Sequence, residues 1–211
     1  MKFNVTPLYS SGLLNDNVFK ESFFSFCQKA FEEKDQPAHS NMWDEDWKNN
    51  SNTLLYHLYI SKRLSSDTGE TFILMDNEEI IAVSSVYISE FDKNVAIGGV
   101  RSWVDKKYRG KFILGRYVLP HQLAWARERR LKTIALTFNE YNKRLLPYFR
   151  RSGVGIKKNR NPNSLFYTGL HEIDFPCEVQ YTKQWIIYSK IDEEYTPDWH
   201  AIKWKDRNDI R

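Results

Sequence analysis

The segment from Trp103 to Gly153 constrains the fold most, because it contains a series of predicted strands, turns and helices in a definite order. A strand is followed by a basic turn with two glycines, a helix, a second apolar strand, an Asn-rich turn and a short helix. Strand, helix and strand in this order form a βαβ-type unit with a right-handed crossover. The turn, residues 108–116, reads Tyr-Arg-Gly-Lys-Phe-Ile-Leu-Gly-Arg. Unpaired amides at a helix start, among fixed positive charges, suit a bound phosphate.

The remaining pattern predicts one continuous α/β domain. Apolar residues at helical spacing predict helices at Asp16–Glu33 and Asn52–Leu64. The helix after the basic turn is expected from Ile113 to Arg130, with a kink or local break at Pro120, which lacks a backbone donor. Strands are predicted at 71–75, 80–88, 95–104, 133–138, 165–168 and 180–188. We expect residues 1–192 to form a single domain, followed by a polar tail at 193–211.

Composition predicts a soluble, cytoplasmic protein. Apolar residues make up 41% and charged residues 27% of the 211 residues, which is typical of a globular domain. The first twenty residues carry too many polar groups for a signal peptide, and no apolar run is long enough for a membrane span. We expect the two cysteines, Cys27 and Cys177, to be reduced thiols. No histidine has metal-ligand spacing, so no metal site is predicted.

The net charge of +4 conceals an uneven distribution. Residues 101–163 carry 17 Lys or Arg against three acidic residues, whereas the rest of the chain carries 14 against 24. One face should therefore have a strongly positive potential that attracts a polyanion. A phosphate-rich cofactor and a nucleic acid are the two candidate ligands for such a face.

The order of these motifs resembles the core of the GCN5-related N-acetyltransferase (GNAT) superfamily over about a quarter of the chain. In that family a strand ends in an apolar and a Pro- or Asp-type residue, followed by a tyrosine and an Arg/Gln-x-x-Gly-x-Gly/Ala turn. A helix, a strand and an Asn-led helix that ends in glycine come next. The matching residues are Val104, Asp105, Tyr108, Arg109, Gly110, Lys111, Gly115, Arg116, Asn139, Asn142, Lys143, Arg144 and Gly153.

The resemblance implies a GNAT-like α/β (α+β) fold. Its mixed, mostly antiparallel sheet would contain a splayed parallel strand pair, with helices on both faces. Acetyl-CoA would be the co-substrate, with its phosphates on the basic turn and its pantetheine arm along the strand that ends at Val104. The cofactor-binding residues so implied are Trp103, Val104, Arg109, Gly110, Lys111, Phe112, Ile113, Leu114, Gly115, Arg116 and Asn142.

The implied reaction transfers an acyl group to an unidentified amine by direct attack in a ternary complex. The amine must lose a proton and the departing thiolate must gain one. The strand at 95–104 has no carboxylate, so Glu140 or a water relay is the candidate base. The family's proton-donating tyrosine aligns with Phe149, which leaves its neighbour Tyr148 as the candidate acid. The acidic segment Trp43–Trp47 is either a wall for a cationic acceptor or a solvated loop.

The turn also departs from the family pattern. Aligned on Gly115, it is one residue longer than the usual turn, and Ile113 stands at the first motif glycine. A Cβ there would crowd the phosphates unless the extra residue bulges out. Two alternatives therefore stay open, namely an inactive CoA- or ligand-binding module and a domain that binds nucleic acid or an acidic partner through the basic face 101–163. Nucleic acid is disfavoured because aromatic residues are not evenly interleaved with the basic ones. The oligomeric state is also open.

Overall fold

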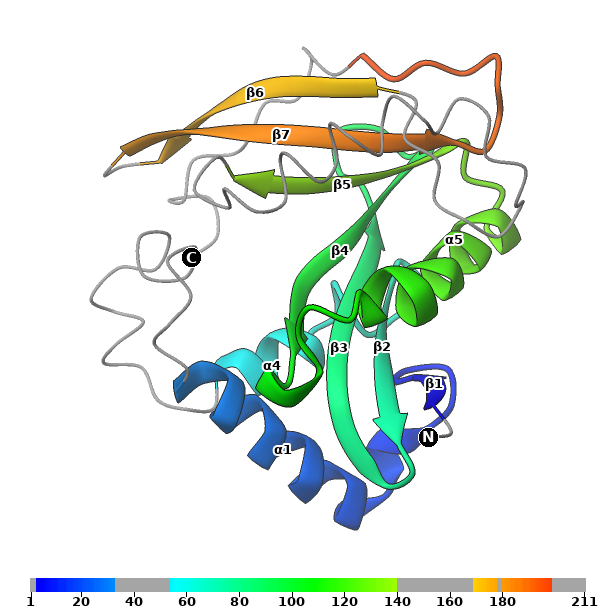
Figure 1. Ribbon diagram of the computed structural model, residues 1–211. Helices are drawn as coiled ribbons and strands as arrows, with labels where there is room; N and C mark the ends of the chain where they lie inside the picture. Colours follow the sequence, from blue (N-terminus) through cyan, green and yellow to red (C-terminus); the bar gives the residue numbers. More distant parts are fainter. Residues whose placement is uncertain (1–2, 33–53, 140–168, 178–179, 199–211) are drawn as a thin grey trace.

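The protein is described here by a computed structural model that covers residues 3–32, 54–139, 169–177 and 180–198 (Figure 1). Seven strands of this part of the chain form one sheet in the order β1-β2-β3-β4-β5-β7-β6. The strands are β1 (Phe3–Pro7), β2 (Gly69–Asp76), β3 (Glu79–Ile88), β4 (Val95–Val104), β5 (Thr133–Asn139), β6 (Gly169–Cys177) and β7 (Gln180–Lys190). The helices are α1 (Asn17–Glu32), α4 (Leu54–Tyr59) and α5 (Leu119–Glu128), with short turns of helix at η1 (Leu13–Asn15), η2 (Lys106–Tyr108) and η3 (Leu114–Val118).

Helix α1 begins where the sequence predicts a helix. The side chain of Asp16 caps it by accepting hydrogen bonds from the amides of Val18 and Phe19, at 2.8 and 3.3 Å. The buried residues of α1 recur at helical spacing on one face, which packs on the sheet together with α4. They are Phe23, Phe26, Cys27 and Ala30. The predicted helix at 52–64 is shorter in the structure, where α4 ends at Tyr59.

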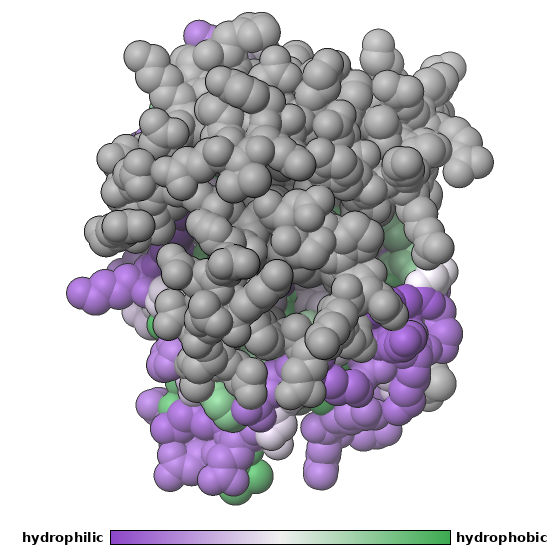
Figure 2. All heavy atoms as spheres, turned by 90° about the vertical axis from the view of Figure 1, so that its left-hand side faces the viewer, coloured by the Kyte–Doolittle hydropathy of each residue, from purple (hydrophilic) through white to green (hydrophobic). Residues whose placement is uncertain are grey.

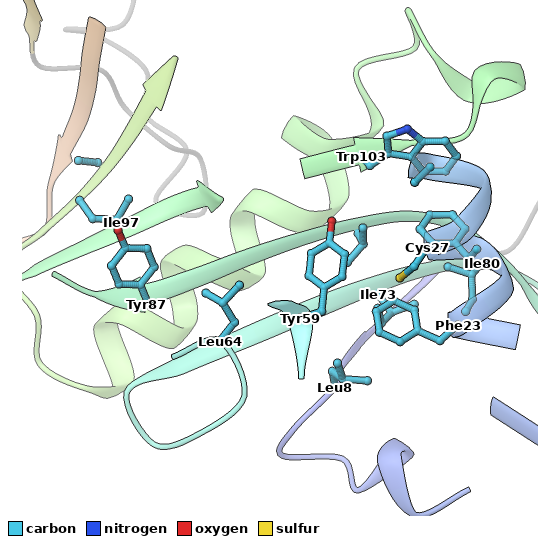
Figure 3. Close-up of a cluster of buried hydrophobic side chains, with 14 of the residues drawn as sticks. Leu8, Phe23, Cys27, Tyr59, Leu64, Ile73, Ile80, Tyr87, Ile97 and Trp103 are labelled. Carbon is cyan, nitrogen blue, oxygen red and sulfur yellow. The ribbon is translucent and has the colours of Figure 1, made fainter. Parts of the chain in front are cut away.

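Helices cover both faces of the sheet, as predicted. One hydrophobic cluster lies between the sheet and the helices α1 and α4, and a second lies between the sheet and α5. Tyr59 lies in the middle of the first cluster, with Tyr87 on one side and Phe23 on the other (Figure 3). Cys27 is a buried free thiol in this cluster, and burial raises its pKa. Among the described residues, no helix is long and apolar enough to cross a membrane.

The predicted hairpin, the strand at 95–104 and the strand at 133–138 are confirmed as β2–β3, β4 and β5. The β2–β3 turn contains Asn77 in the left-handed conformation, with φ 56°, which asparagine tolerates well. Two strands were missed. Strand β1 is short and only half-buried, and β6 contains Pro176 at the edge of the sheet, where a missing donor is tolerated. The strand predicted at 165–168 lies outside the described residues.

Candidate functional site

The sheet opens between β4 and β5. These strands form the one parallel pair among the described strands, and their pairing runs only from Val95–Thr133 to Gly98–Leu136. Beyond that point β5 continues to pair with β7, whereas β3 is the one described strand with which β4 still pairs. The residues of β4 are buried up to Gly98 and, except for the buried Trp103, half-buried from Gly99 onward. Residues 99–104, called here the open half of β4, therefore have an edge that no described strand pairs with, called here the free edge. Residues 95–98 are the closed half of β4.

Two irregularities turn β4 away from β5. Its register with β3 shifts twice, between the pairs Val83–Trp103 and Ser85–Val100 and again before Tyr87–Ile97. Gly99 and Arg101 in this region have φ values of 67° and 51°, which strands avoid. These are β-bulges, which bend a strand and increase its twist.

The bulge at Arg101 is held from the α4 side of the sheet. The hydroxyl of Tyr59 donates a hydrogen bond to the carbonyl of Arg101. Burial raises the pKa of Tyr59 well above its ordinary value, so the phenol stays protonated as a donor. Burial also lowers the pKa of Arg101 to about 10, and its guanidinium remains charged at neutral pH. Arg101 therefore places a positive charge on the α4 side of β4.

The free edge presents the backbone of Val104. The amide of Asp105 donates to Ile81 on β3 at 2.8 Å. Because backbone groups point alternately to the two edges of a strand, the peptide groups of Val104 point to the opposite edge. The Nε of Arg109 donates to the Val104 carbonyl at 2.8 Å, which agrees with this direction. The sequence resemblance placed the pantetheine arm along this edge.

The side chain of Trp103 points toward α1 and not toward the free edge. It is 3% exposed and packs edge-on against Phe26 of α1, with ring centroids 4.7 Å apart. The guanidinium of Arg109 lies 5.4 Å from the centre of its ring. The indole of Trp103 is therefore packed in the core, and by the same alternation its backbone points toward Val83 of β3.

A buried carboxylate joins the end of β4 to the basic turn. Asp105 caps η2 by accepting from the Lys107 amide at 2.9 Å, and its other oxygen accepts from Nζ of Lys29 on α1. Burial alone would raise the pKa of Asp105, but the bonds from Lys29 and Lys107 outweigh it and hold the pKa below its usual value. The start of the turn is thus tied to both α1 and β4.

The basic turn ends at a helix start that has no side-chain cap. Helix η3 begins after Ile113, which provides no side-chain cap, and no cap for it is found within the described residues. Gly110 has φ 79°, and nothing among the described residues lies within 4 Å of the position of a Cβ there. Lys111 and Arg116 are exposed beside these amides. The Arg116 amide donates to the Phe112 carbonyl at 3.1 Å, and an uncapped helix start among cations is an arrangement that binds anions.

The extra residue of the sequence lies in the helix rather than in the turn. Residues 114–118 form a π-helix, in which the Leu119 amide donates to the Leu114 carbonyl, five residues back. A π-helical turn accommodates one more residue than the α-helix around it. This finding differs from the sequence alignment on Gly115. Counted from Arg109, the turn keeps the family's length and Phe112, not Ile113, stands at the first motif glycine.

The conformation of the two residues agrees with this alignment. Phe112 has φ 54°, the left-handed conformation that glycine adopts without cost. Ile113 is 4% exposed and packs in the cluster beneath α5, so its side chain does not crowd the turn. The expected break near Pro120 is confirmed, because the π-helix changes to α5 at Leu119 and Pro120 stands in its first turn.

Phe112 covers Gly115. Its ring carbons Cζ and Cε1 lie 2.2 and 2.3 Å from the position that a Cβ of Gly115 would occupy. The ring is 48% exposed and lies over the first turn of the helix. The absent side chain of Gly115 thus makes room for an aromatic ring beside the amides at the helix start.

Three of the sequence-predicted site residues, Glu140, Asn142 and Tyr148, lie outside the described residues, as does the segment Trp43–Trp47. The structure brings the others together at the end of β4, in the turn and at the start of η3. Sequence reasoning missed Tyr59, Ser84, Ser102 and Gln122, which hold the open half of β4. The Gly98–Gly99 pair within a strand was the available signal for a bulge.

The basic face is partly neutralised where it is described. Lys107 pairs with Glu79 at 3.0 Å, and Lys132 pairs with Asp192 at 3.6 Å. The guanidinium of Arg129 lies 4.1 Å from the centre of the Trp125 ring. On the side of the molecule seen in Figure 2, the coloured hydrophilic residues lie mainly in the lower part, at the height of α1 and the β2–β3 turn in Figure 1. In the part of the chain that the structure describes, no group of three His, Cys, Asp or Glu is placed to hold a metal.

A sheet that opens at one parallel pair, beside an uncapped helix start in a basic turn, has the architecture of CoA-dependent acyltransferases. The chain belongs to the acetyltransferase (GNAT) family, whose model matches residues 29–154. Acetyl-CoA is the general co-substrate of this family. A comparison with curated protein sequences gave no match.

Solved structures share the fold at low sequence identity. A GNAT-family acetyltransferase from Streptococcus pneumoniae has a TM-score of 0.56 at 14% identity, over 90% of this chain and 100% of that one. A GCN5-related N-acetyltransferase from Kribbella flavida has a TM-score of 0.56 at 13% identity, over 90% and 98%. A chimera of the spermidine N-acetyltransferase from Vibrio cholerae has a TM-score of 0.55 at 13% identity, over 90% and 96%. At such identities these likenesses concern the fold alone.

Proposed function

We propose that this protein is an acetyl-CoA-dependent N-acyltransferase that transfers the acyl group directly to an amine. The observation that carries the proposal is the free edge of β4 at Val104, which leads into the basic turn and the uncapped start of η3. An extended pantetheine arm pairs with a free strand edge, and phosphates bind at a helix N-terminus. Family membership supports the same cofactor.

The proposed reaction divides the work among few groups. The Val104 amide donates to the thioester oxygen and stabilises the negative charge that develops there, which is worth about 3 kcal/mol in comparable sites. The amine nitrogen attacks the thioester carbon, the C–N bond forms and the C–S bond breaks. The amine proton leaves through Glu140 or water, and the CoA thiolate takes a proton from Tyr148. These two residues, like the phosphate contact of Asn142, rest on the resemblance of the sequence.

Acetyl-CoA binding is the first test. Saturation at a hundredfold excess over Kd adds about 2.7 kcal/mol of stability. For a chain of this size the melting temperature should rise by roughly 5–10 °C. No rise with acetyl-CoA would contradict the proposed function.

A pair of charge reversals shows whether the basic turn is the site. Lys111 and Lys93 are both exposed, in the loops that follow and precede β4. Lys111→Glu should weaken acetyl-CoA binding at least about tenfold, because a carboxylate replaces a cation beside the phosphates. Lys93→Glu changes the net charge equally but should leave affinity within about twofold, because screening limits its reach. Equal losses of acetyl-CoA affinity in the two variants would mean that binding depends on the net charge of the protein and not on the basic turn.

The ring of Phe112 favours a second candidate, a GNAT-fold module whose cofactor site is closed. Phe112→Gly separates the two candidates, because it restores the family's glycine and removes the ring over Gly115. If the enzyme proposal holds, the wild type binds acetyl-CoA and the variant binds it more tightly. Binding by Phe112→Gly alone would identify the closed module. Screening amines for release of the CoA thiol, with Tyr148→Phe as the comparison, then tests turnover.

A further inference from the structure

Both backbone polar groups of Gly99 are bound by side chains. Its amide donates to Oε1 of Gln122 on α5 at 2.8 Å, and its carbonyl accepts from the hydroxyl of Ser102 at 2.8 Å. Gly99 is the first residue of β4 beyond the pairing with β5. Side chains therefore replace the strand ladder at the point where the sheet opens.

These two bonds belong to one closed ring of hydrogen bonds. Nε2 of Gln122 donates to the hydroxyl of Ser84 at 2.9 Å, and the hydroxyls of Ser84 and Ser102 lie 2.7 Å apart. Because Ser102 donates to the Gly99 carbonyl, Ser84 must donate to Ser102. The Gly99 amide can only donate, which fixes the Gln122 amide in one orientation. Each hydroxyl thus donates once and accepts once, and the ring has a single arrangement.

The ring lies in an apolar environment. Gln122 and Ser84 are fully buried, next to the hydrophobic cluster beneath α5. Buried polar groups cost free energy unless every one of them is paired. Leucine at position 122 would fill the space but would leave the Gly99 amide without the partner that Gln122 provides. The polar ring therefore does something that packing alone does not, and what it holds is the shape of β4.

We propose that Gln122, Ser84 and Ser102 are positioning residues that hold the open half of β4 in the shape that receives the pantetheine arm of acyl-CoA. The inference rests on the proposed function. Ser102 carries the constraint along the strand, because it is bound to Gly99 and lies two residues before Val104. A Cβ on Gly98 would come within 2.9 Å of Oε1 of Gln122, so the neighbouring residue is fitted to the same side chain.

The experiment compares two ligands of different reach. Acetyl-CoA contacts the turn and the strand edge, whereas adenosine 3′,5′-bisphosphate has no pantetheine arm and contacts the turn alone. Gln122→Leu and Ser84→Ala should lower affinity for acetyl-CoA about tenfold, a typical loss when a positioned binding surface is loosened. Both variants should bind the bisphosphate as the wild type does. Calorimetric titration measures both affinities, and Ser84→Ala decides the matter if Gln122→Leu does not fold.

Ser85→Ala is the matched control. Ser84 and Ser85 are adjacent on β3 and fully buried, and each pairs with another hydroxyl, but Ser85 pairs with Thr71 at 2.8 Å on the other face. Both serine variants should lose similar melting temperature, and only Ser84→Ala should lose acetyl-CoA affinity. Equal acetyl-CoA affinities in the two variants would overturn this inference and leave the proposed function standing. No binding to the wild type would overturn both.

Discussion

The two halves of β4 are held in place by different kinds of hydrogen bonds. Residues 95–98 have a backbone partner on each side, β3 and β5, so ladder hydrogen bonds define their course. Residues 99–104 have β3 on one side, and their bends are held by side chains from α5, β3 and α4. A ladder forms wherever two extended strands meet, whereas a strand edge that must stay free for a ligand needs other bonds to hold it. The comparison shows that side-chain hydrogen bonds, rather than a strand ladder, fix the course of β4 where the sheet opens.

The largest expected effect comes from adding a methyl group at the boundary between the halves. Gly99→Ala should lower the free energy of unfolding by about 2–3 kcal/mol, through left-handed strain and contact with Leu136. The Cβ would lie 2.8 Å from Cδ2 of Leu136, on the strand that β4 leaves. Gly110→Ala has the same backbone strain at φ 79° but open space, and should cost about 1 kcal/mol. Urea denaturation measures both, and equal losses would mean that Leu136 yields freely.

A smaller effect is expected from the side-chain hydrogen bond at the bulge of Arg101. Tyr59→Phe should cost about 1–2 kcal/mol, because it leaves the Arg101 carbonyl without its donor in a buried place. Tyr108→Phe is the comparison, since the Tyr108 hydroxyl donates to Asp76 at 2.9 Å, next to solvent. Its loss should be under about 1 kcal/mol, because water can replace the donor. Equal losses would show that the bond from Tyr59 does not specifically hold the bulge.

The smallest effect is a pH dependence at the end of the open half. The pKa of Asp105 is lower in the folded protein than in the unfolded chain, so its stabilisation is fully present above about pH 4. That stabilisation is lost as the pH falls through the lowered pKa. Asp105→Asn should therefore be less stable than the wild type at pH 7, and the gap should narrow as the pH falls below about 4. A gap that stays constant in urea titrations down to pH 2 would contradict this reading.

Periodicity and turn chemistry predicted the elements that lie near the site. The hairpin β2–β3, the strands β4 and β5 and the helix after the basic turn were all evident, because alternation and helical spacing are local signals. The position of the extra residue was not, because a π-helical turn and a longer loop add the same single residue to a sequence. The edge strands β1 and β6 were not predicted, because edge strands carry weak apolar patterns.

The sequence by itself determined the order of the elements, the basic helix start and the resemblance to the GNAT superfamily. These follow from residues that are neighbours in the chain, whose spacing sets local conformation. Only the tertiary structure decided which side chains hold β4 open and which residue covers Gly115. Gln122, Ser84 and Gly99 come from three separate elements, and their hydrogen bonds exist only after α5 has packed on the sheet. Bonds of this kind depend on the distance between elements, which packing sets and local patterns do not record.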